Sequence, residues 1–466
     1  MLHTDLPAFA LVGHPNKGKS SIVSTLAYDD SVRISSVPGE TIKTQEFPLK
    51  VDGEVQYRLF DTPGFQVPRR VLEWLKEHES TSSKHPEVIQ AFVEEHKSNS
   101  AFNDEVELLT PIIEGACIVY VVDGSKPYSE EYESEMEILR WSGRPSIALI
   151  NTINDDDYTL EWENALNQHF KMVRLYNPMQ ATFKEKIALL ETLSHLNAHW
   201  TTSLKNSIET LKLFQQQRMN ETARLITETI YQSIIYTLSS SLFKKSISQE
   251  DKVHYSQDYL EHLVNLEYKE QKSIEKLWGH FHLSTHNSHQ DFHVMELFSQ
   301  ESQKVFGLSK SSLILVSAVA GAIAGGSAGI MFAPIDGGIS SFVTASFGAV
   351  TATLGSLAGY GKYLNIVTLG GRFEQKQLKI GPMKDTNFPF ILLARSLFHA
   401  IQITQRSHAA RDEINLDGYF ADTLLDSSQK KTFASLHRQF QKGSNVTEAK
   451  GDYQKMLIEL LHTKIS

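Results

Sequence analysis

The chain of 466 residues allows two or three domains at the usual size of about 150 residues per domain. Its 45 Lys and Arg residues stand against 55 Asp and Glu residues, and this formal net charge of −10 argues against a protein that coats nucleic acid. Hydrophobic residues at 41% and charged residues at 21% are typical of a globular protein, which excludes a wholly disordered or fibrous chain.

From residue 8 to residue 176, short apolar runs alternate with helical stretches, which predicts a mostly parallel sheet with flanking helices. The first run leads directly into a glycine-rich turn and a helix predicted over Ser20–Ala27. Residues 66–114 are too polar for strands and are interpreted as an enlarged switch region with helices over Lys76–Lys84 and Val93–Asn99. Strands are predicted at Ala8–Val12, Tyr57–Phe60, Cys117–Val122, Ser146–Ile150 and Val173–Tyr176.

The turn after the first strand reads Gly-His-Pro-Asn-Lys-Gly-Lys-Ser and matches the phosphate-loop pattern G-x-x-x-x-G-K-[ST] in full. Its glycines allow backbone N–H groups to curl around an anion, and the helix that follows adds partial positive charge. Lys19 is expected to reach the β- and γ-phosphates, and the Ser20 hydroxyl to bind Mg²⁺. The predicted nucleotide-binding residues here are Gly13, His14, Pro15, Asn16, Lys17, Gly18, Lys19, Ser20 and Ser21.

A second magnesium ligand is expected at the end of a neighbouring strand, where residues 61–64 read Asp-Thr-Pro-Gly. Asp61 would bind the metal, and the Gly64 N–H would sense the γ-phosphate. Thr41 is predicted to close over Mg²⁺ when a triphosphate is bound, although it can also be an ordinary loop residue. Lys19, Thr41 and Gly64 are the predicted catalytic residues.

Gly-x-Pro-Asn-x-Gly-Lys-Ser, Pro-Gly-x-Thr and Asp-Thr-Pro-Gly-Phe together resemble the Era/TrmE branch of translation-factor-related GTPases, over residues 1–182. The whole chain also resembles a group of bacterial GTPases that end in a helical domain of unknown function. This resemblance implies a P-loop GTPase that binds GTP and GDP with Mg²⁺, and it implies that Asn16 can bind K⁺. Phe65 stands where Ras-like proteins place the glutamine that positions water, so slow intrinsic hydrolysis, assisted by K⁺, dimerisation or a partner, is expected.

The base-reading segment departs from the pattern N-K-x-D, because this chain reads Asn151-Thr152-Ile153-Asn154. The amide of Asn154 offers one acceptor and one donor where guanine readers have a carboxylate that accepts twice. Asp155 could take that role by a shift of one residue, or residues 155–157 could form a charged turn and helix cap. We expect Asn151 and Asn154 to lie at the base, with weak discrimination between GTP and other purine triphosphates.

A second, mainly α-helical domain is predicted over residues 183–466. Residues 311–361 within it are apolar and rich in Gly and Ala, with Asp336 as their one charged residue, and predict a helical hairpin. Each half, residues 312–333 and 339–360, is long enough to cross a hydrocarbon core of about 30 Å, but is equally suited to burial inside a helical domain. Helices are also predicted over Glu185–Lys205, Ile208–Phe243, Phe388–His408 and Ser427–Lys442.

The predicted function is a GTP-hydrolysing molecular switch that controls the helical domain. The alternatives are a nucleotide-stabilised scaffold or membrane-remodelling protein with negligible turnover, and a P-loop ATPase with relaxed base specificity. The expected partners are GTP and GDP, a second copy of the chain or a protein effector, and the inner membrane through residues 312–360, without nucleic acid.

Three further features of the sequence concern the location of the protein, its one cysteine and a group of histidines. The N-terminal residues lack a basic segment followed by an apolar run, which predicts a cytoplasmic protein, with attachment to the cytoplasmic face of the inner membrane if the hairpin inserts. Cys117 is the one cysteine and lies in an apolar run, so disulfides and thiolate metal sites are not expected. Five histidines could bind a metal, although polar helix ends explain them as well. They are His280, His282, His286, His289 and His293.

Overall fold

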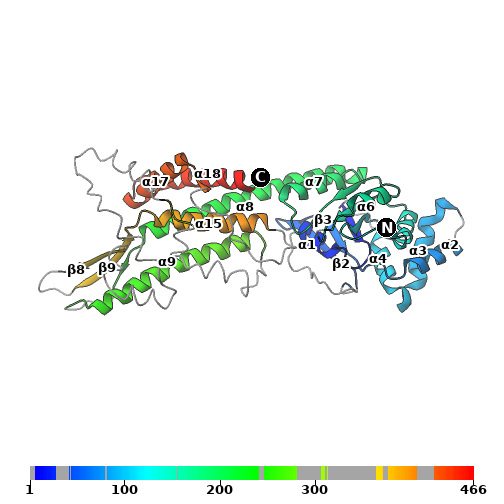
Figure 1. The fold of residues 1–466 in the computed structure, drawn as a ribbon, viewed down its shortest axis with the longest axis horizontal. Coiled ribbons are helices and arrows are strands. Elements are labelled where there is room, and N and C mark those ends of the chain that lie inside the picture. The colour runs from blue at the N-terminus through cyan, green and yellow to red at the C-terminus, as the bar shows by residue number, and fades with distance from the viewer. Residues whose placement is uncertain are drawn as a thin grey trace. The chain divides into compact units, whose positions relative to one another are not determined.

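The computed structural model of the chain describes residues 6–27, 41, 43–78, 81–154, 156–240, 246–280, 306–309, 312, 364–370, 376–406 and 424–465. They form two compact units, which divide at residues 216 and 217 within the long helix α8 (Thr201–Ile235) (Figure 1). The predicted domain boundary at residues 182 and 183 lies earlier in the chain. The helix in between, α7 (Phe183–Leu193), buries Ile187 and Leu190 in the core of the first unit, so it packs with the sheet.

The first unit is built on a six-stranded sheet with the strand order β2-β3-β1-β4-β5-β6, in which only β2 runs antiparallel to its neighbour. Leu11 of β1 pairs with Asp61 of β3, so these two strands end side by side. The five predicted strands are confirmed, and their carboxyl ends meet at one edge of the sheet. The strands are β1 (Ala8–Val12), β2 (Gln45–Val51), β3 (Glu54–Asp61), β4 (Cys117–Asp123), β5 (Ser146–Asn151) and β6 (Val173–Leu175).

Strand β2 was not predicted, because its sequence Gln-Glu-Phe-Pro-Leu-Lys-Val carries polar residues and a proline. Such a strand is tolerated at the edge of a sheet, where one side needs no hydrogen-bonding partner.

The predicted helices of residues 66–114 exist, but their predicted bounds are wrong. The first two helices each carry a proline in their first turn, Pro68 in α2 and Pro86 in α3. A missing N–H costs nothing there, because the first N–H groups of a helix have no partner within the helix. The stretch Lys76–Lys84 therefore spans the end of α2 and the residues before α3 instead of forming one helix. The helices of the unit that precede α7 are α1 (Lys19–Ala27), α2 (Pro68–Glu77), α3 (His85–His96), α4 (Asn103–Ile113), α5 (Glu131–Trp141) and α6 (Thr159–Leu166).

The second unit is mainly helical, as predicted, and Figure 1 shows its helices packed along one another. The predicted helix Ser427–Lys442 is confirmed with the same bounds. Asp426 caps its first turn, and Gly443 ends the helix with a φ of 65°. The described helices beyond α8 are α9 (Gln249–Leu277), α15 (Phe388–Gln405), α17 (Ser427–Lys442) and α18 (Val446–Ile465).

Two predictions for the C-terminal part are corrected by the structure. The predicted helix Glu185–Lys205 is broken, because the Asn197 side chain accepts from the His199 N–H and starts a separate turn. The predicted helix Ile208–Phe243 ends at Ile235 and gives way to a small sheet that the sequence analysis missed. Its strands, in the order β7-β9-β8, are β7 (Leu238–Ser239), β8 (Leu364–Leu369) and β9 (Gln377–Met383).

The predicted apolar hairpin of residues 311–361 lies outside the described residues, apart from Ser312. Within the described part of the chain, we find no helix with both the length and the apolar character to cross a membrane.

A layer of buried polar side chains joins α9 to α15 in the second unit. Glu267 accepts hydrogen bonds of 2.5 and 3.2 Å from Arg395, and both residues are buried. Glu270 accepts from the Ser396 hydroxyl at 3.0 Å, while its Oε1 atom is buried without a hydrogen-bond partner among the described residues. Burial raises the pKa of Glu270 to about 8, against the opposing hydrogen bonds from Ser396 and Thr229.

Glu270→Gln is expected to stabilise the second unit, and more so as the pH rises. A folded-state pKa of about 8 against an ordinary value of 4.5 means that the folded chain holds a proton that the unfolded chain releases between these pH values. Stability therefore falls as the pH rises through this window, by an amount on the order of 3 kcal/mol at pH 7. Thermal unfolding from pH 5 to pH 8 should show the variant and the wild type diverging, whereas Glu261→Gln on the exposed face of α9 should follow the wild type.

Candidate functional site

The loop from Gly13 to Ser20 connects β1 to α1 and has the backbone geometry of a phosphate cradle. Gly13 has a φ of 139°, and a Cβ there would lie 2.4 Å from the Val121 carbonyl oxygen. Gly18 has a φ of 88°, and a Cβ there would lie 2.2 Å from the Asn151 side-chain nitrogen. Both glycines are therefore required by the close approach of β4 and β5 to the loop.

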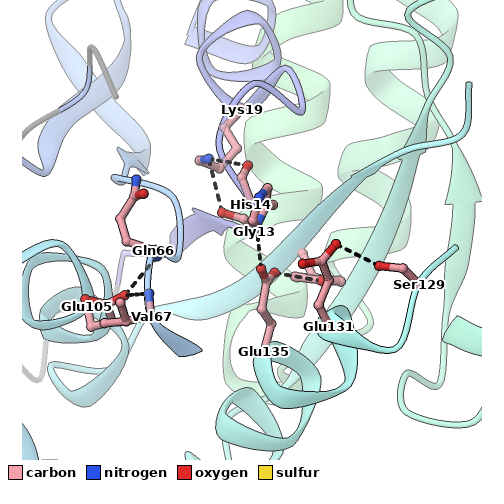
Figure 2. Close-up of polar contacts among 10 residues, drawn as sticks. Gly13, His14, Lys19, Gln66, Val67, Glu105, Ser129, Glu131 and Glu135 are labelled. Atoms are coloured by element: carbon pink, nitrogen blue, oxygen red, sulfur yellow. Dashed lines mark hydrogen bonds and ion pairs between the residues drawn. The ribbon is translucent and has the colours of Figure 1, made fainter. Parts of the chain in front are cut away.

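Lys19 occupies the centre of this loop. Its Nζ atom donates to the Gly13 carbonyl at 3.2 Å and to the His14 carbonyl at 3.0 Å, as Figure 2 shows. The side chain is 7% exposed, and burial lowers its pKa to about 8 against the opposing charge of Asp61. A buried ammonium group that donates to two carbonyl oxygens is suited to bind a further anion.

Asp61 lies at the end of β3 beside the loop. Its Oδ2 atom accepts from the Ser20 hydroxyl at 2.7 Å. Its Oδ1 atom is buried and accepts no hydrogen bond from the described residues. Burial raises the pKa of Asp61, and hydrogen bonds from Ser20 and Thr41 together with the charge of Lys19 oppose the rise. The structure thus brings the three predicted magnesium ligands, Ser20, Thr41 and Asp61, to one place.

The donor set fits Mg²⁺. The ion takes oxygen ligands, and this site offers two hydroxyl groups and a carboxylate with one buried oxygen that has no partner among the described residues. A cation beside Asp61 would compensate the burial of its charge, which the protein alone leaves incompletely compensated.

The segment after Asp61 packs against the phosphate loop at Gly64 and Phe65. A Cβ at Gly64 would lie 2.4 Å from the Pro15 nitrogen, so a side chain cannot be accommodated. The Phe65 N–H donates to the Gly13 carbonyl at 3.3 Å, and its ring is fully buried. The Phe65 ring is therefore a core side chain and offers no group that could orient water.

The predicted base-reading residues lie on the other side of the loop. Asn151 is buried at the end of β5, and its amide donates to the Lys17 carbonyl at 3.1 Å. Asn154 is exposed and donates to the Ser125 hydroxyl at 3.4 Å. Asp155 lies outside the described residues. The structure therefore gives Asn151 a role in holding the phosphate loop and places Asn154 at the surface, next to Ser125.

Three further predicted residues of the loop and its helix are Lys17, Ser21 and Asn16. Lys17 is 4% exposed, and its Nζ atom lies 3.9 Å from Asp123 and 5.6 Å from the centre of the Tyr132 ring. Burial lowers the pKa of Lys17, opposed mainly by Asp123. Ser21 is buried within α1. Asn16 has a φ of 59°, a conformation that asparagine tolerates better than most residues, so the backbone alone explains its presence.

A buried carboxylate that the sequence analysis missed tethers the phosphate loop to α5. Glu135 is 1% exposed; one of its oxygens lies 3.0 Å from His14 Nδ1, and the other accepts from the Tyr120 hydroxyl at 2.9 Å (Figure 2). The signal for it was available, since Glu135 falls among the buried positions Met136 and Leu139 on the inner face of α5. A carboxylate at such a position needs partners from another element.

Of the five clustered histidines, the structure describes only His280. His280 is buried, and the other four histidines lie outside the described residues. Among the residues with described placement, no group of three or more His, Cys, Asp or Glu side chains could hold a metal ion.

Comparisons with known proteins identify two families along the chain. Residues 163–461 match the family described as domain of unknown function DUF3482, and residues 8–152 match the family described as 50S ribosome-binding GTPase. The chain is 25% identical over 238 residues to GTPase Der of Mycoplasma pneumoniae, covering 51% of this chain and 44% of that protein. It is 24% identical over 226 residues to GTPase Der of Bacillus thuringiensis, covering 47% and 46%. The matches thus span less than half the length of these relatives.

Among solved structures, a variant of Aquifex aeolicus Era bound to GDP and tetrafluoroaluminate is similar over 59% of this chain and 90% of its own, with 14% identity and a TM-score of 0.30.

Proposed function

We propose that this chain, which belongs to the DUF3482 family and carries a P-loop GTPase domain ahead of the DUF3482 region, is a molecular switch that hydrolyses GTP. The observation that carries the proposal is the convergence of Lys19, Ser20 and Asp61 at the carboxyl ends of β1 and β3, where one buried Asp61 oxygen accepts no hydrogen bond from the part of the chain that the structure describes. Phosphoryl transfer depends mainly on positioning and on charge stabilisation, and this arrangement supplies both.

The predicted catalytic and magnesium-binding residues each have a role in this proposal. Lys19 and the loop N–H groups bind the β- and γ-phosphates. Ser20, Thr41 and Asp61 hold Mg²⁺, which neutralises charge on the phosphate oxygens when it is bound. The Gly64 N–H contacts the γ-phosphate and reports its loss after hydrolysis. Thr41 and Gly64 thereby transmit the nucleotide state to the helical unit.

Slow intrinsic turnover with stimulation by K⁺ is the finer part of the proposal. The buried Phe65 ring supplies no hydrogen bond to water, so hydrolysis needs help from another source. Asn16 in the phosphate loop is the proposed K⁺ ligand.

Asn16→Gly is the informative variant for potassium, because glycine adopts a φ of 59° without strain and removes only the amide. With Mg²⁺ present, we expect faster phosphate release from GTP in K⁺ than in Na⁺ buffer for the wild type. The variant is expected to show the same slow rate in both buffers. Equal wild-type rates in the two buffers would remove K⁺ from the mechanism, and no release in either would favour the scaffold alternative.

The base site favours a second candidate, a P-loop NTPase with relaxed base selection that also accepts ATP. Asn154 stands where a carboxylate would present two acceptor oxygens to two guanine donors, whereas its amide presents one acceptor oxygen and one donor nitrogen. Weak preference for GTP over other purine triphosphates is the expected result.

The partners and the location are proposals as well. Control of the helical unit, pairing of two copies or binding of a protein effector, and contact with the inner membrane through residues 312–360 all agree with a cytoplasmic switch. The net charge of −10 supports the absence of a nucleic-acid partner. The description of the matching GTPase family includes ribosome binding, so co-sedimentation with ribosomes is the test of this last point.

A further inference from the structure

Helix α4, the last helix of the inserted region, holds the segment that follows Gly64. The Glu105 Oε1 atom accepts from the Gln66 N–H at 2.8 Å and from the Val67 N–H at 2.7 Å (Figure 2). Glu105 is 1% exposed, so the accepting carboxyl group is itself buried. Both N–H groups come directly before α2, where a helix begins and negative charge is favoured.

The same helix also holds the segment that follows Thr41. Glu107 accepts from the Thr44 N–H at 3.0 Å through its side chain, and its backbone carbonyl accepts from the Thr44 hydroxyl at 2.7 Å. Thr41 lies three residues before Thr44, close enough to Asp61 to lower the pKa of that carboxyl group. Two residues within one turn of α4, Glu105 and Glu107, therefore hold both segments that are proposed to surround the γ-phosphate.

The opposite end of the Gly64 segment is fixed on the phosphate loop. Gly64 lies against Pro15 so closely that no Cβ fits, and the Phe65 N–H donates to the Gly13 carbonyl. Residues 64–67 therefore contact the phosphate loop at one end and Glu105 at the other. The direction of the Gly64 N–H depends on both.

We propose that Glu105 is a positioning residue for GTP hydrolysis, which sets the Gly64 N–H relative to the γ-phosphate, and that α4 couples this segment to that of Thr41 through Glu107. This inference rests on the proposed function. Glu105 acts through the backbone and touches no reacting atom, so its loss lowers turnover and leaves GDP binding intact, because GDP lacks the γ-phosphate. Displacement of a positioned group by about 1 Å is enough to cost up to a hundredfold in rate.

Glu105→Gln and Glu105→Ala test the proposal in the full-length protein with Mg²⁺. For Glu105→Ala we expect kcat for GTP to fall by about tenfold and the Kd of GDP to stay within about twofold. Glu105→Gln, which keeps an acceptor oxygen but not the charge, should lie between the alanine variant and the wild type. Glu114→Gln, an exposed residue at the end of the same helix, is the matched control and should behave as the wild type.

Thermal unfolding of each variant separates positioning from folding. If Glu105→Ala does not fold, Glu105→Gln decides alone. An unchanged kcat in a folded Glu105 variant would overturn the proposal, and so would a parallel loss of kcat, GDP affinity and melting temperature, which indicates a purely structural role. A wild-type protein without GTP turnover would instead contradict the proposed function.

Discussion

Lys19→Ala is expected to abolish measurable GTP hydrolysis and to weaken GTP binding by at least about 100-fold. The Nζ atom is the cation at the centre of the phosphate loop, and in the structure it is held by the carbonyl oxygens of Gly13 and His14. Because the surroundings are buried, an anion placed there interacts with this ammonium group more strongly than it would in water. Alanine leaves the loop backbone in place but removes the charge.

The measurement is the binding of a fluorescent GTP analogue together with phosphate release, for the wild type and the variant. Lys50→Ala, at an exposed position on β2, is the control and should match the wild type in both assays. Wild-type turnover by Lys19→Ala in a folded protein would show that the phosphate loop is not the catalytic site.

Arg395→Leu is expected to destabilise the second unit by about 3–5 kcal/mol. The substitution leaves the Glu267 carboxylate buried between α9 and α15 without the guanidinium group that now donates two hydrogen bonds to it. An uncompensated buried charge costs far more than the pair itself contributes. Urea unfolding followed by circular dichroism should show a loss of this size.

Two further variants serve as controls for this loss of stability. Adding Glu267→Leu to Arg395→Leu removes the stranded charge and should recover most of the lost stability. Arg224→Leu breaks an exposed pair with Glu221 on α8 and should cost less than about 1 kcal/mol. If Arg395→Leu costs no more than Arg224→Leu, the buried pair is not a determinant of the second unit.

Much of the nucleotide-binding unit could be predicted because its signals are local. The pattern from Gly13 to Ser20 specifies its own turn, and the buried parallel strands read as continuous apolar runs such as Cys117–Val122. Strand β2 could not be found in this way, since its exposed, proline-containing sequence pairs on one side only. In the second unit, β8 and β9 are placed by pairing with each other and with β7, more than a hundred residues earlier in the chain.

The residues around the site show the same limit. Ser20, Asp61 and Lys19 carry recognisable spacing, whereas Glu105 and Glu135 contact residues 39 and 121 positions away along the chain. The helical pattern marks them as acidic residues on buried faces, for Glu105 next to Leu108 and Leu109. It cannot name their partners, because those depend on how the helices pack.

A GTP-binding site built on this phosphate loop is tested most directly by calorimetric titration of the full-length protein with GTP, ATP and XTP in Mg²⁺ buffer. We predict that GTP binds in the presence of K⁺, that Lys19→Ala removes the binding, and that ATP and XTP bind less than 100-fold more weakly, because Asn154 replaces a carboxylate. Absence of binding for all three nucleotides would contradict the account and move the function to the helical unit.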